Sequence, residues 1–187
     1  MIGVVSVLIG VDMVIDCKTL ANDIKLDIKE KVSNLKSKPR FLVIHVEYND
    51  ASKVYVRNKK KACEEIGIEF YEFTYASDVT TDRLVRDIKV NQSGYDAVMV
   101  QLPLPSHIDE HAVINAIDPN KDVDGLTDVN VGRLWRGEDG LFPCTALGVV
   151  EVLKSTYLTL SGIDVAIVGR SNLVGKPLAG LLLRYNA

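Results

Sequence analysis

The stretch Phe41-Leu42-Val43-Ile44-His45-Val46 decides the fold, because it is a short and almost wholly apolar run rich in β-branched residues. Such a run is typical of a strand buried on both faces, as in a parallel sheet. A helical pattern follows at residues 51–66 and ends at Gly67, a natural C-cap. Within the run, we interpret His45 as a core histidine whose ring nitrogens are satisfied.

Strands and helices alternate on both sides of this run. The remaining helical patterns lie at residues 18–36, 80–91, 107–116 and 145–157 and from Lys176 onward, and the remaining strand patterns at 68–73, 96–101 and 163–168. This alternation predicts an α/β fold with a parallel sheet covered on both faces. Residues 118–144 are rich in loop-forming glycine and proline. We therefore predict two domains, residues 13–143 and residues 144–187.

The composition excludes several classes of protein. Hydrophobic residues make up 47% and charged residues 25% of the 187 residues, and the formal net charge is -3, so no nucleic-acid surface is expected. Cys17, Cys63 and Cys144 are too widely spaced for a disulfide framework or a zinc pattern, which favours a reducing cytoplasm. The apolar residues 1–12 are interrupted by Asp12, and we interpret them as an extension and not as a membrane anchor.

Lys59 lies on an unusual face of the helix predicted at residues 51–66. At 100° per residue, Tyr55, Lys59, Ala62 and Ile66 form one stripe that should dock on the sheet. A lysine placed there must be paired, must extend into solvent, or must change its charge state as water is removed. Spacing alone favours the solvated lysine, since lysines are rarely buried. The last alternative would make Lys59 an acid–base group.

Two other functional interpretations of the sequence, a short-chain dehydrogenase and a zinc site, are weaker. Tyr-x-x-x-Lys is also found in short-chain dehydrogenases, but there the glycine-rich nucleotide turn precedes the Tyr/Lys pair, and here the order is reversed. His107 and His111 are four residues apart, as in zinc-binding helices, but no third ligand is evident, so we expect no metal.

Four segments together carry a family resemblance. They are ASKVYVRNKKKA (51–62), VQLPLP (100–105), DPNKDVDGL (118–126) and GRSNLVGKP (169–177). In order and spacing the chain resembles the bifunctional methylenetetrahydrofolate dehydrogenase/methenyltetrahydrofolate cyclohydrolase family. The resemblance spans residues 13–187, but the C-terminal segments of the family are absent, and we expect a truncated chain.

The resemblance implies a folate-binding parallel-sheet domain followed by an incomplete Rossmann-like dinucleotide domain. It implies catalytic roles for Lys59, Gln101, Tyr55 and Asp124, and folate contacts from Tyr55, Gln101, Leu102, Pro103 and Asp124. The chemistry of each residue type agrees with these roles. Gln101 ends a parallel strand, where ligands of α/β sheets bind, and its amide could hydrogen-bond Lys59. A carboxylate such as Asp124 can accept two parallel hydrogen bonds from an amino-pyrimidine edge.

The resemblance also implies NADP, or NAD, as cofactor. Its contacts would come from Thr145, Gly169, Arg170, Ser171 and Gly175, where a strand, a glycine turn and a helix start follow one another. The residue that reads the adenosine ribose would fall beyond Ala187, so we expect weak or absent nicotinamide binding. We also expect the leucines of the last helix (Leu178, Leu181, Leu182 and Leu183) to be exposed.

The function that the resemblance implies is a pair of one-carbon reactions. The first is the NADP-dependent oxidation of methylenetetrahydrofolate to methenyltetrahydrofolate, and the second is hydrolysis of that product to formyltetrahydrofolate. The alternative is a folate-binding remnant or interaction module without redox activity. We expect a cytoplasmic protein with a small-molecule folate substrate and no nucleic-acid, membrane or metal partner, and a homodimer in the full-length family.

Overall fold

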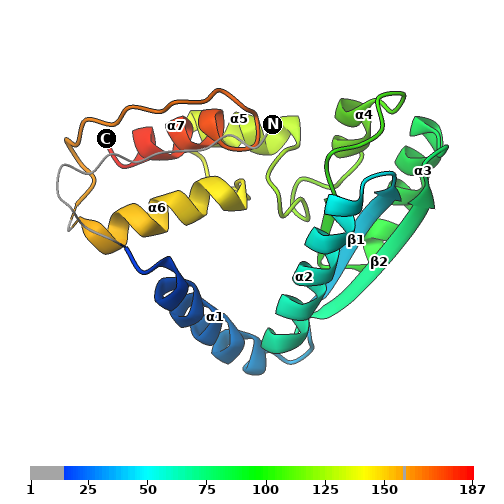
Figure 1. Cartoon of the computed structure of the whole chain (residues 1–187), viewed down its shortest axis with the longest axis horizontal. Helices are drawn as coiled ribbons and strands as arrows, with labels where there is room; N and C mark the ends of the chain where they lie inside the picture. The colour runs from blue at the N-terminus through cyan, green and yellow to red at the C-terminus, as the bar shows by residue number, and fades with distance from the viewer. Residues whose placement is uncertain (1–14, 158) are drawn as a thin grey trace. The chain divides into compact units, whose positions relative to one another are not determined.

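The computed structural model describes residues 15–157 and 159–187 (Figure 1). The expectation that residues 1–12 form an extension lies outside these residues. Among the residues described, no helix has both the length and the apolar character needed to cross a bilayer.

A three-stranded parallel sheet forms the centre of the N-terminal fold. Its order is β2 (Glu69–Ala76), β1 (Arg40–Glu47) and β3 (Ala97–Val100), and β1 pairs in parallel with both neighbours. In the register, Phe41 pairs with Phe70 on β2 and with Ala97 on β3. The predicted α/β class and the central position of the 41–46 run are thus confirmed, since β1 is the middle strand.

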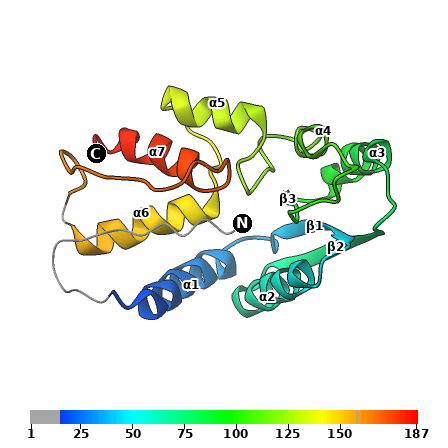
Figure 2. The ribbon, with the colours of Figure 1, turned by 45° about the horizontal axis from the view of Figure 1, so that its top comes forward.

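Helices cover both faces of this sheet (Figure 2). α2 (Asp50–Ile66) packs on the face that carries Val43 and Met99. α3 (Thr81–Asn91) and the short α4 (Glu110–Ile114) pack on the opposite face, against a larger apolar cluster. Because side chains alternate along a strand, β1 supplies core residues to both faces. This explains why its sequence is almost continuously apolar.

The helix termini follow local sequence signals. Asn49 caps α2 through its side-chain oxygen, which accepts from the amide of Ala51, and the predicted C-cap Gly67 adopts a left-handed conformation with φ 89°. α1 (Cys17–Ser33) precedes the sheet, and Lys25 on it forms an ion pair with Glu65 on α2.

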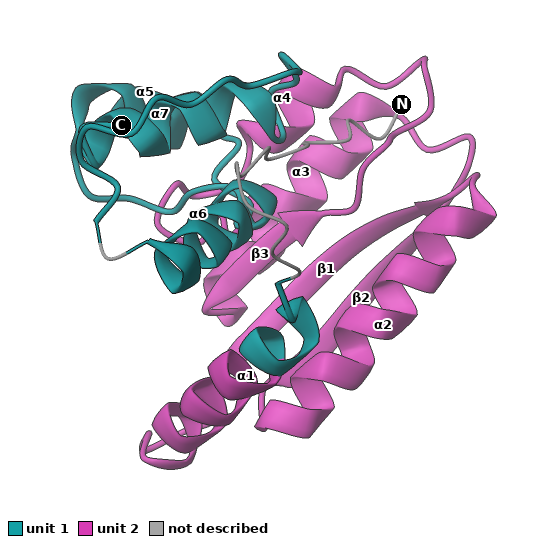
Figure 3. Cartoon of the chain, turned by 60° about the vertical axis from the view of Figure 1, so that its left-hand side comes forward, with its two compact units in different colours: residues 1–21, 124–187 teal, residues 22–123 magenta. Residues whose placement is uncertain are grey.

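The chain divides into two compact units (Figure 3). One is Asn22–Val123 and contains the sheet. The other is Asp124–Ala187 together with the N-terminal stretch up to Ala21.

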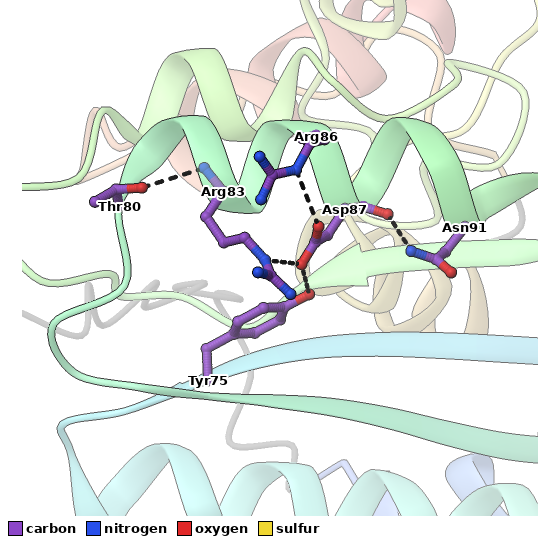
Figure 4. Close-up of polar contacts among 6 residues, drawn as sticks. All are labelled: Tyr75, Thr80, Arg83, Arg86, Asp87 and Asn91. Carbon is purple, nitrogen blue, oxygen red and sulfur yellow. Dashed lines mark hydrogen bonds and ion pairs between the residues drawn. The ribbon is translucent and has the colours of Figure 1, made fainter.

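A polar cluster joins α3 to β2 (Figure 4). The Asp87 carboxylate accepts from the hydroxyl of Tyr75 over 3.1 Å and from Nε of Arg83 over 2.5 Å. The hydrogen bond from Arg83 holds the pKa of Asp87 below its usual value. Burial, aided by the neighbouring carboxylate, raises the pKa of Tyr75 to about 12. The neutral phenol and the charged carboxylate therefore stabilise one another at neutral pH.

Residues 118–144, which are rich in loop-forming glycine and proline, contain a helix. α5 (Asp128–Arg136) begins at Thr127, whose hydroxyl accepts from the amide of Asn130, and ends at Gly137 with φ 74°. These are ordinary N-cap and C-cap signals, which glycine and proline content concealed. The interpretation of residues 118–144 as rich in loops missed this helix of nine residues.

The C-terminal unit is built mainly on helices. α6 (Cys144–Thr156) and α7 (Gly175–Arg184) pack together around an apolar cluster. Leu178, Leu181 and Leu182 belong to this cluster and are buried, and of the four leucines predicted to be exposed only Leu183 is. The expectation of an exposed leucine face was wrong because α6 and α5 supply apolar partners.

The strand predicted at residues 163–168 is also wrong. The segment forms no ladder with any strand of the described chain. A β-strand is defined by its pairing, and an apolar β-branched run without a neighbour stays irregular. Val168 is accordingly exposed.

Candidate functional site

Lys59 and Gln101 meet at the carboxyl end of the sheet. The Nζ atom of Lys59 donates a hydrogen bond of 2.9 Å to Oε1 of Gln101. Gln101 directly follows β3. Its backbone N–H donates to the carbonyl of Ile44, which continues the β1–β3 ladder by one bond. The sheet therefore holds the backbone of Gln101. Its side chain is buried, whereas that of Lys59 is partly buried. Of the three alternatives for Lys59, the structure shows the paired one.

The carboxamide of Gln101 is held at both of its ends. Its Nε2 atom donates to the carbonyl of Leu102 over 2.7 Å while its oxygen accepts from Lys59. Leu102 is partly buried and Pro103 is exposed, and the peptide bond between them is cis. The predicted folate contacts Leu102 and Pro103 thus lie immediately beside the carboxamide in the chain.

Tyr55 lies one helical turn before Lys59 on α2. The centroid of its ring is 5.9 Å from Nζ of Lys59, which is the range of a cation–π contact. Its side chain is 49% exposed, so it does not belong to the buried stripe that helical spacing predicted. The fully buried residues of α2 are instead Ser52, Val56 and Cys63. The stripe is rotated by part of a turn, which leaves Tyr55 at its rim.

Asp124 stands in a turn that only glycine can complete. The following residue, Gly125, has φ 63°, and a Cβ atom there would lie 2.4 Å from the carbonyl oxygen of Leu141. Asp124 itself is partly buried. Asp122, by contrast, is buried, and its backbone forms an isolated bridge with Val98 of β3.

The second group of predicted residues surrounds the start of α7. A Cβ atom on Gly175 would lie 2.2 Å from the carbonyl oxygen of Gly169, so the turn closes too tightly for any larger residue. Ser171 stabilises the turn, because its hydroxyl accepts from the amide of Val174 over 3.1 Å. Pro177 sits in the first turn of the helix, where proline is well tolerated.

The exposed groups at this turn fit the phosphates of a dinucleotide. Arg170 and Ser171 are exposed beside a glycine turn that opens a helix of 10 residues. A cation, a hydroxyl and a helix N-terminus are the groups that bind phosphate. Thr145 is exposed in the first turn of α6.

His107 contacts the protein backbone. His107 contacts the carbonyl of Val79 through Nε2 over 3.0 Å, and no group of three His, Cys, Asp or Glu side chains forms within the described ranges. His45 lies in the core, as interpreted, but the expectation that both of its ring nitrogens are satisfied was wrong. Its Nδ1 lies 3.5 Å from Glu72, but its buried Nε2 has no hydrogen-bond partner within the described chain. The sequence indicates only that His45, two residues after Val43, lies on the same face of β1.

A lysine and a glutamine paired at the carboxyl edge of a parallel sheet mark a ligand-binding α/β domain, since ligands of such sheets bind at strand ends. A glycine turn that opens a helix marks the start of a dinucleotide-binding domain. The chain belongs to the tetrahydrofolate dehydrogenase/cyclohydrolase family: the catalytic domain of that family matches residues 15–124, and its NAD(P)-binding domain matches residues 143–187.

Individual relatives agree with this family. The chain is 46% identical over 178 residues to the bifunctional protein FolD of Agathobacter rectalis, a match that covers 92% of this chain and 64% of the relative. The crystal structure of the bifunctional enzyme FolD from Campylobacter jejuni matches with a TM-score of 0.88 and 40% identity, over 92% of this chain and 63% of that one. The Trypanosoma brucei dehydrogenase-cyclohydrolase, complexed with NADP cofactor and inhibitor, matches with a TM-score of 0.85 and 33% identity, over 94% and 62%. The chain thus spans 64% of the first of these relatives.

Proposed function

We propose that this protein is a bifunctional folate one-carbon enzyme. It would oxidise methylenetetrahydrofolate to methenyltetrahydrofolate with NADP and hydrolyse the product to formyltetrahydrofolate. The observation that carries the proposal is the hydrogen bond between Lys59 Nζ and Gln101 Oε1 at the carboxyl edge of the sheet. This pairing places an amine and a carboxamide where α/β domains bind their ligands.

In the hydrolytic step, Lys59 would handle the proton. Water adds to the methenyl carbon, one carbon–nitrogen bond of the bridge breaks, and one proton is released in the overall reaction. An ammonium group has three N–H donors, and Gln101 accepts only one of them. The others have no hydrogen-bond partner within the described chain and can polarise the bridge. Only a neutral Lys59 amine, with its lone pair free, could take the proton of the attacking water and then release it to solvent.

The other residues would bind and orient the substrate. Tyr55, half-exposed one turn from Lys59, offers a ring for stacking on the folate. Asp124 would bind the amino-pyrimidine edge of the pterin through two parallel hydrogen bonds. Leu102 and Pro103 would line the substrate-binding site beside Gln101. We expect Asp124→Ala to raise KM for the folate about tenfold or more, the effect of losing a charge-assisted hydrogen bond.

NADP would accept the hydride of the oxidation step. Gly169, Arg170, Ser171, Gly175 and Thr145 would hold it, and Arg170 supplies the only full positive charge among them. A calorimetric titration of NADP into the protein and into Arg170→Ala tests this assignment. We expect the affinity of Arg170→Ala to fall several-fold, and equal affinities would contradict the role of Arg170.

One assay separates this proposal from a folate-binding module. Hydrolysis of methenyltetrahydrofolate is followed with and without added NADP, and reduction of NADP is followed with methylenetetrahydrofolate. Turnover in both assays supports the bifunctional enzyme. Saturable folate binding without turnover in either would support a binding module in its place.

The finer assignments concern the assembly and the compartment. We propose a homodimer, as in the full-length family, which light scattering would test. We propose a cytoplasmic location, because Cys17, Cys63 and Cys144 are all free thiols. Burial raises the pKa of the Cys63 thiol and makes it unreactive. We propose a small-molecule folate substrate and no nucleic-acid, membrane or metal partner.

A further inference from the structure

Residues 121–123 extend the sheet on the outer side of β3. The amide of Val98 donates to the carbonyl of Lys121 over 2.8 Å, and the amide of Val123 donates to the carbonyl of Val98 over 3.4 Å. These bonds form an isolated parallel bridge. Because the pairing is parallel, the segment runs in the direction of β3, toward the edge of the sheet at which Gln101 stands.

The side chain of Lys121 attaches this segment at a second place. Its Nζ atom donates to the carbonyl of Gln92 over 2.8 Å and to that of Tyr95 over 2.7 Å. These two carbonyls belong to the one-turn 3₁₀ helix Gln92–Gly94, which precedes β3, and to the residue after it. Hydrogen bonds from a charged donor are stronger than those between neutral groups. Lys121 is partly buried, so water competes less for its ammonium group.

The same 3₁₀ helix also holds the start of the segment. The side-chain oxygen of Gln92 accepts from the amide of Asp118 over 2.6 Å, and its side-chain nitrogen donates to the carbonyl of Ala116 over 3.1 Å. The carbonyl of Asp118 in turn accepts from the amides of Lys121 and Asp122 over 2.8 and 3.1 Å. The chain is therefore held along its whole course from Asp118 to the end of the bridge.

Asp124 is the next residue after this held segment. On one side it is bonded to Val123, whose amide pairs with β3. On the other side it is bonded to Gly125, whose φ of 63° suits only glycine and whose added Cβ atom would meet the carbonyl of Leu141. The place at which Asp124 leaves the sheet is thus set by residues 121–123.

We propose that Lys121 is a positioning residue for Asp124. Through its two carbonyl contacts it holds residues 121–123 on β3, and so it fixes the point from which Asp124 presents its carboxylate to the folate. Two parallel hydrogen bonds to an amino-pyrimidine edge need a defined position, because a shift of about 1 Å takes a bond outside its favourable length. The proposal rests on the folate-binding role proposed for Asp124.

The first test needs no substrate. Amide hydrogen exchange is followed by NMR in the full chain at Val98 and Gln101, which donate over 2.8 Å each to opposite sides of β3. In Lys121→Met we expect the Val98 amide to exchange about tenfold faster or more, because its acceptor segment is loosened. The Gln101 amide, which donates to Ile44, should exchange as in the parent protein. Equal changes at both amides, or no change at Val98, would overturn the proposal.

The second test measures binding without turnover. Tetrahydrofolate has the amino-pyrimidine edge but no bridge to hydrolyse, and its dissociation constant is measured by calorimetry. We expect Lys121→Met to raise this constant about three- to tenfold. It should leave kcat for methenyltetrahydrofolate nearly unchanged, because Lys59 and Gln101 keep their hydrogen bond.

A double-mutant cycle separates positioning from general destabilisation. In an Asp124→Ala background, Lys121→Met should weaken tetrahydrofolate binding no further, because the carboxylate that it positions is gone. The same loss of affinity in both backgrounds would refute the positioning role.

Lys154→Met is the matched control. Lys154 lies on α6 and also uses its ammonium group, which donates to Glu151 over 2.9 Å. Its loss should change neither tetrahydrofolate binding nor exchange at Val98. If Lys154→Met weakened binding as much as Lys121→Met, the effect would not be specific and the proposal would fail.

The outcomes also distinguish this proposal from the proposed function. A parent protein that binds no tetrahydrofolate would refute both. Faster exchange at Val98 in Lys121→Met, together with parent-like tetrahydrofolate binding, would refute the positioning role alone.

Discussion

Lys59 and Gln101 are 42 positions apart in the chain, yet Nζ of one lies 2.9 Å from Oε1 of the other. The parallel topology brings them together, because α2 runs back across the sheet from the end of β1 and β3 pairs beside β1. From the sequence, this hydrogen bond was one that Gln101 could form, and the structure contains it. The catalytic roles of the two residues stay predictions.

Replacing Gln101 should impair hydrolysis without unfolding the protein. Gln101→Leu removes the acceptor of Lys59, so we expect kcat for methenyltetrahydrofolate to fall about ten- to a hundredfold, as for a lost hydrogen bond to a charged group. Gln101→Glu keeps an acceptor at this position and should lose less. Circular dichroism spectra of both variants should match that of the parent protein. A Gln101→Leu variant with the parent kcat would show that the pair is not catalytic.

Two glycines should respond in opposite ways to alanine. Gly175→Ala places a Cβ atom against the carbonyl of Gly169, so we expect a loss of about 1–3 kcal/mol in the free energy of unfolding. Gly148 lies inside α6, where an added Cβ atom would meet no other atom within 4 Å, and Gly148→Ala should stabilise the protein by about 0.5–1 kcal/mol. Urea unfolding measures both changes. Equal effects of the two substitutions would contradict the close approach at the turn.

Tyr75 should make stability fall in alkaline solution. Its pKa is raised to about 12 in the folded protein, so the folded state holds its proton more tightly than the unfolded state does. The stabilisation is complete below about pH 10, the usual pKa of tyrosine, and is lost as the pH rises toward 12. Tyr75→Phe cannot ionise. The stability difference between the two proteins should therefore shrink over this range in urea titrations, and a constant difference would be inconsistent with the cluster.

Asp87 should produce the opposite dependence in acid. Its pKa is lowered by the hydrogen bond from Arg83, so the charged carboxylate is favoured in the folded state. Its contribution is present above about pH 4, the usual pKa of aspartate, and is lost as the pH falls below that value. The variant Asp87→Asn should lack this pH-dependent contribution to the free energy of unfolding. Parallel acid-stability curves for Asp87→Asn and the parent protein would argue against it.

The sheet was predictable because its strands carry a strong local signal. The buried run at 41–46, the glycine at 67 and the alternation of helices with strands fix the order of elements, and these agree with the structure. The proximity of Lys59 and Gln101 was expected from the family resemblance, with which the place of Gln101 at a strand end agrees, because spacing alone favoured a solvated lysine. Tyr55 was wrongly predicted to lie on the buried face of α2. Helical spacing gives the positions of residues relative to one another but does not show which of them faces the sheet.

The errors occur where tertiary contacts override local patterns. Residues 163–168 have the composition of a strand, but no ladder forms there in the described chain. Leu178 was predicted to be exposed, but it is buried because α6 packs against it. The sequence could not show that Nε2 of His45 lacks a hydrogen-bond partner in the described chain. Whether a buried imidazole forms its hydrogen bonds depends on the atoms of neighbouring strands.

The most direct measurement is hydrolysis of methenyltetrahydrofolate by Lys59→Ala beside Lys60→Ala. Both residues lie on α2, but Lys60 is exposed and faces away from Gln101. Loss of a proton-transfer group costs about a hundred- to ten-thousandfold in rate. We predict a loss of this size for Lys59→Ala, with an unchanged fold, and a parent-like rate for Lys60→Ala. Parent-like hydrolysis by a folded Lys59→Ala variant would contradict the account.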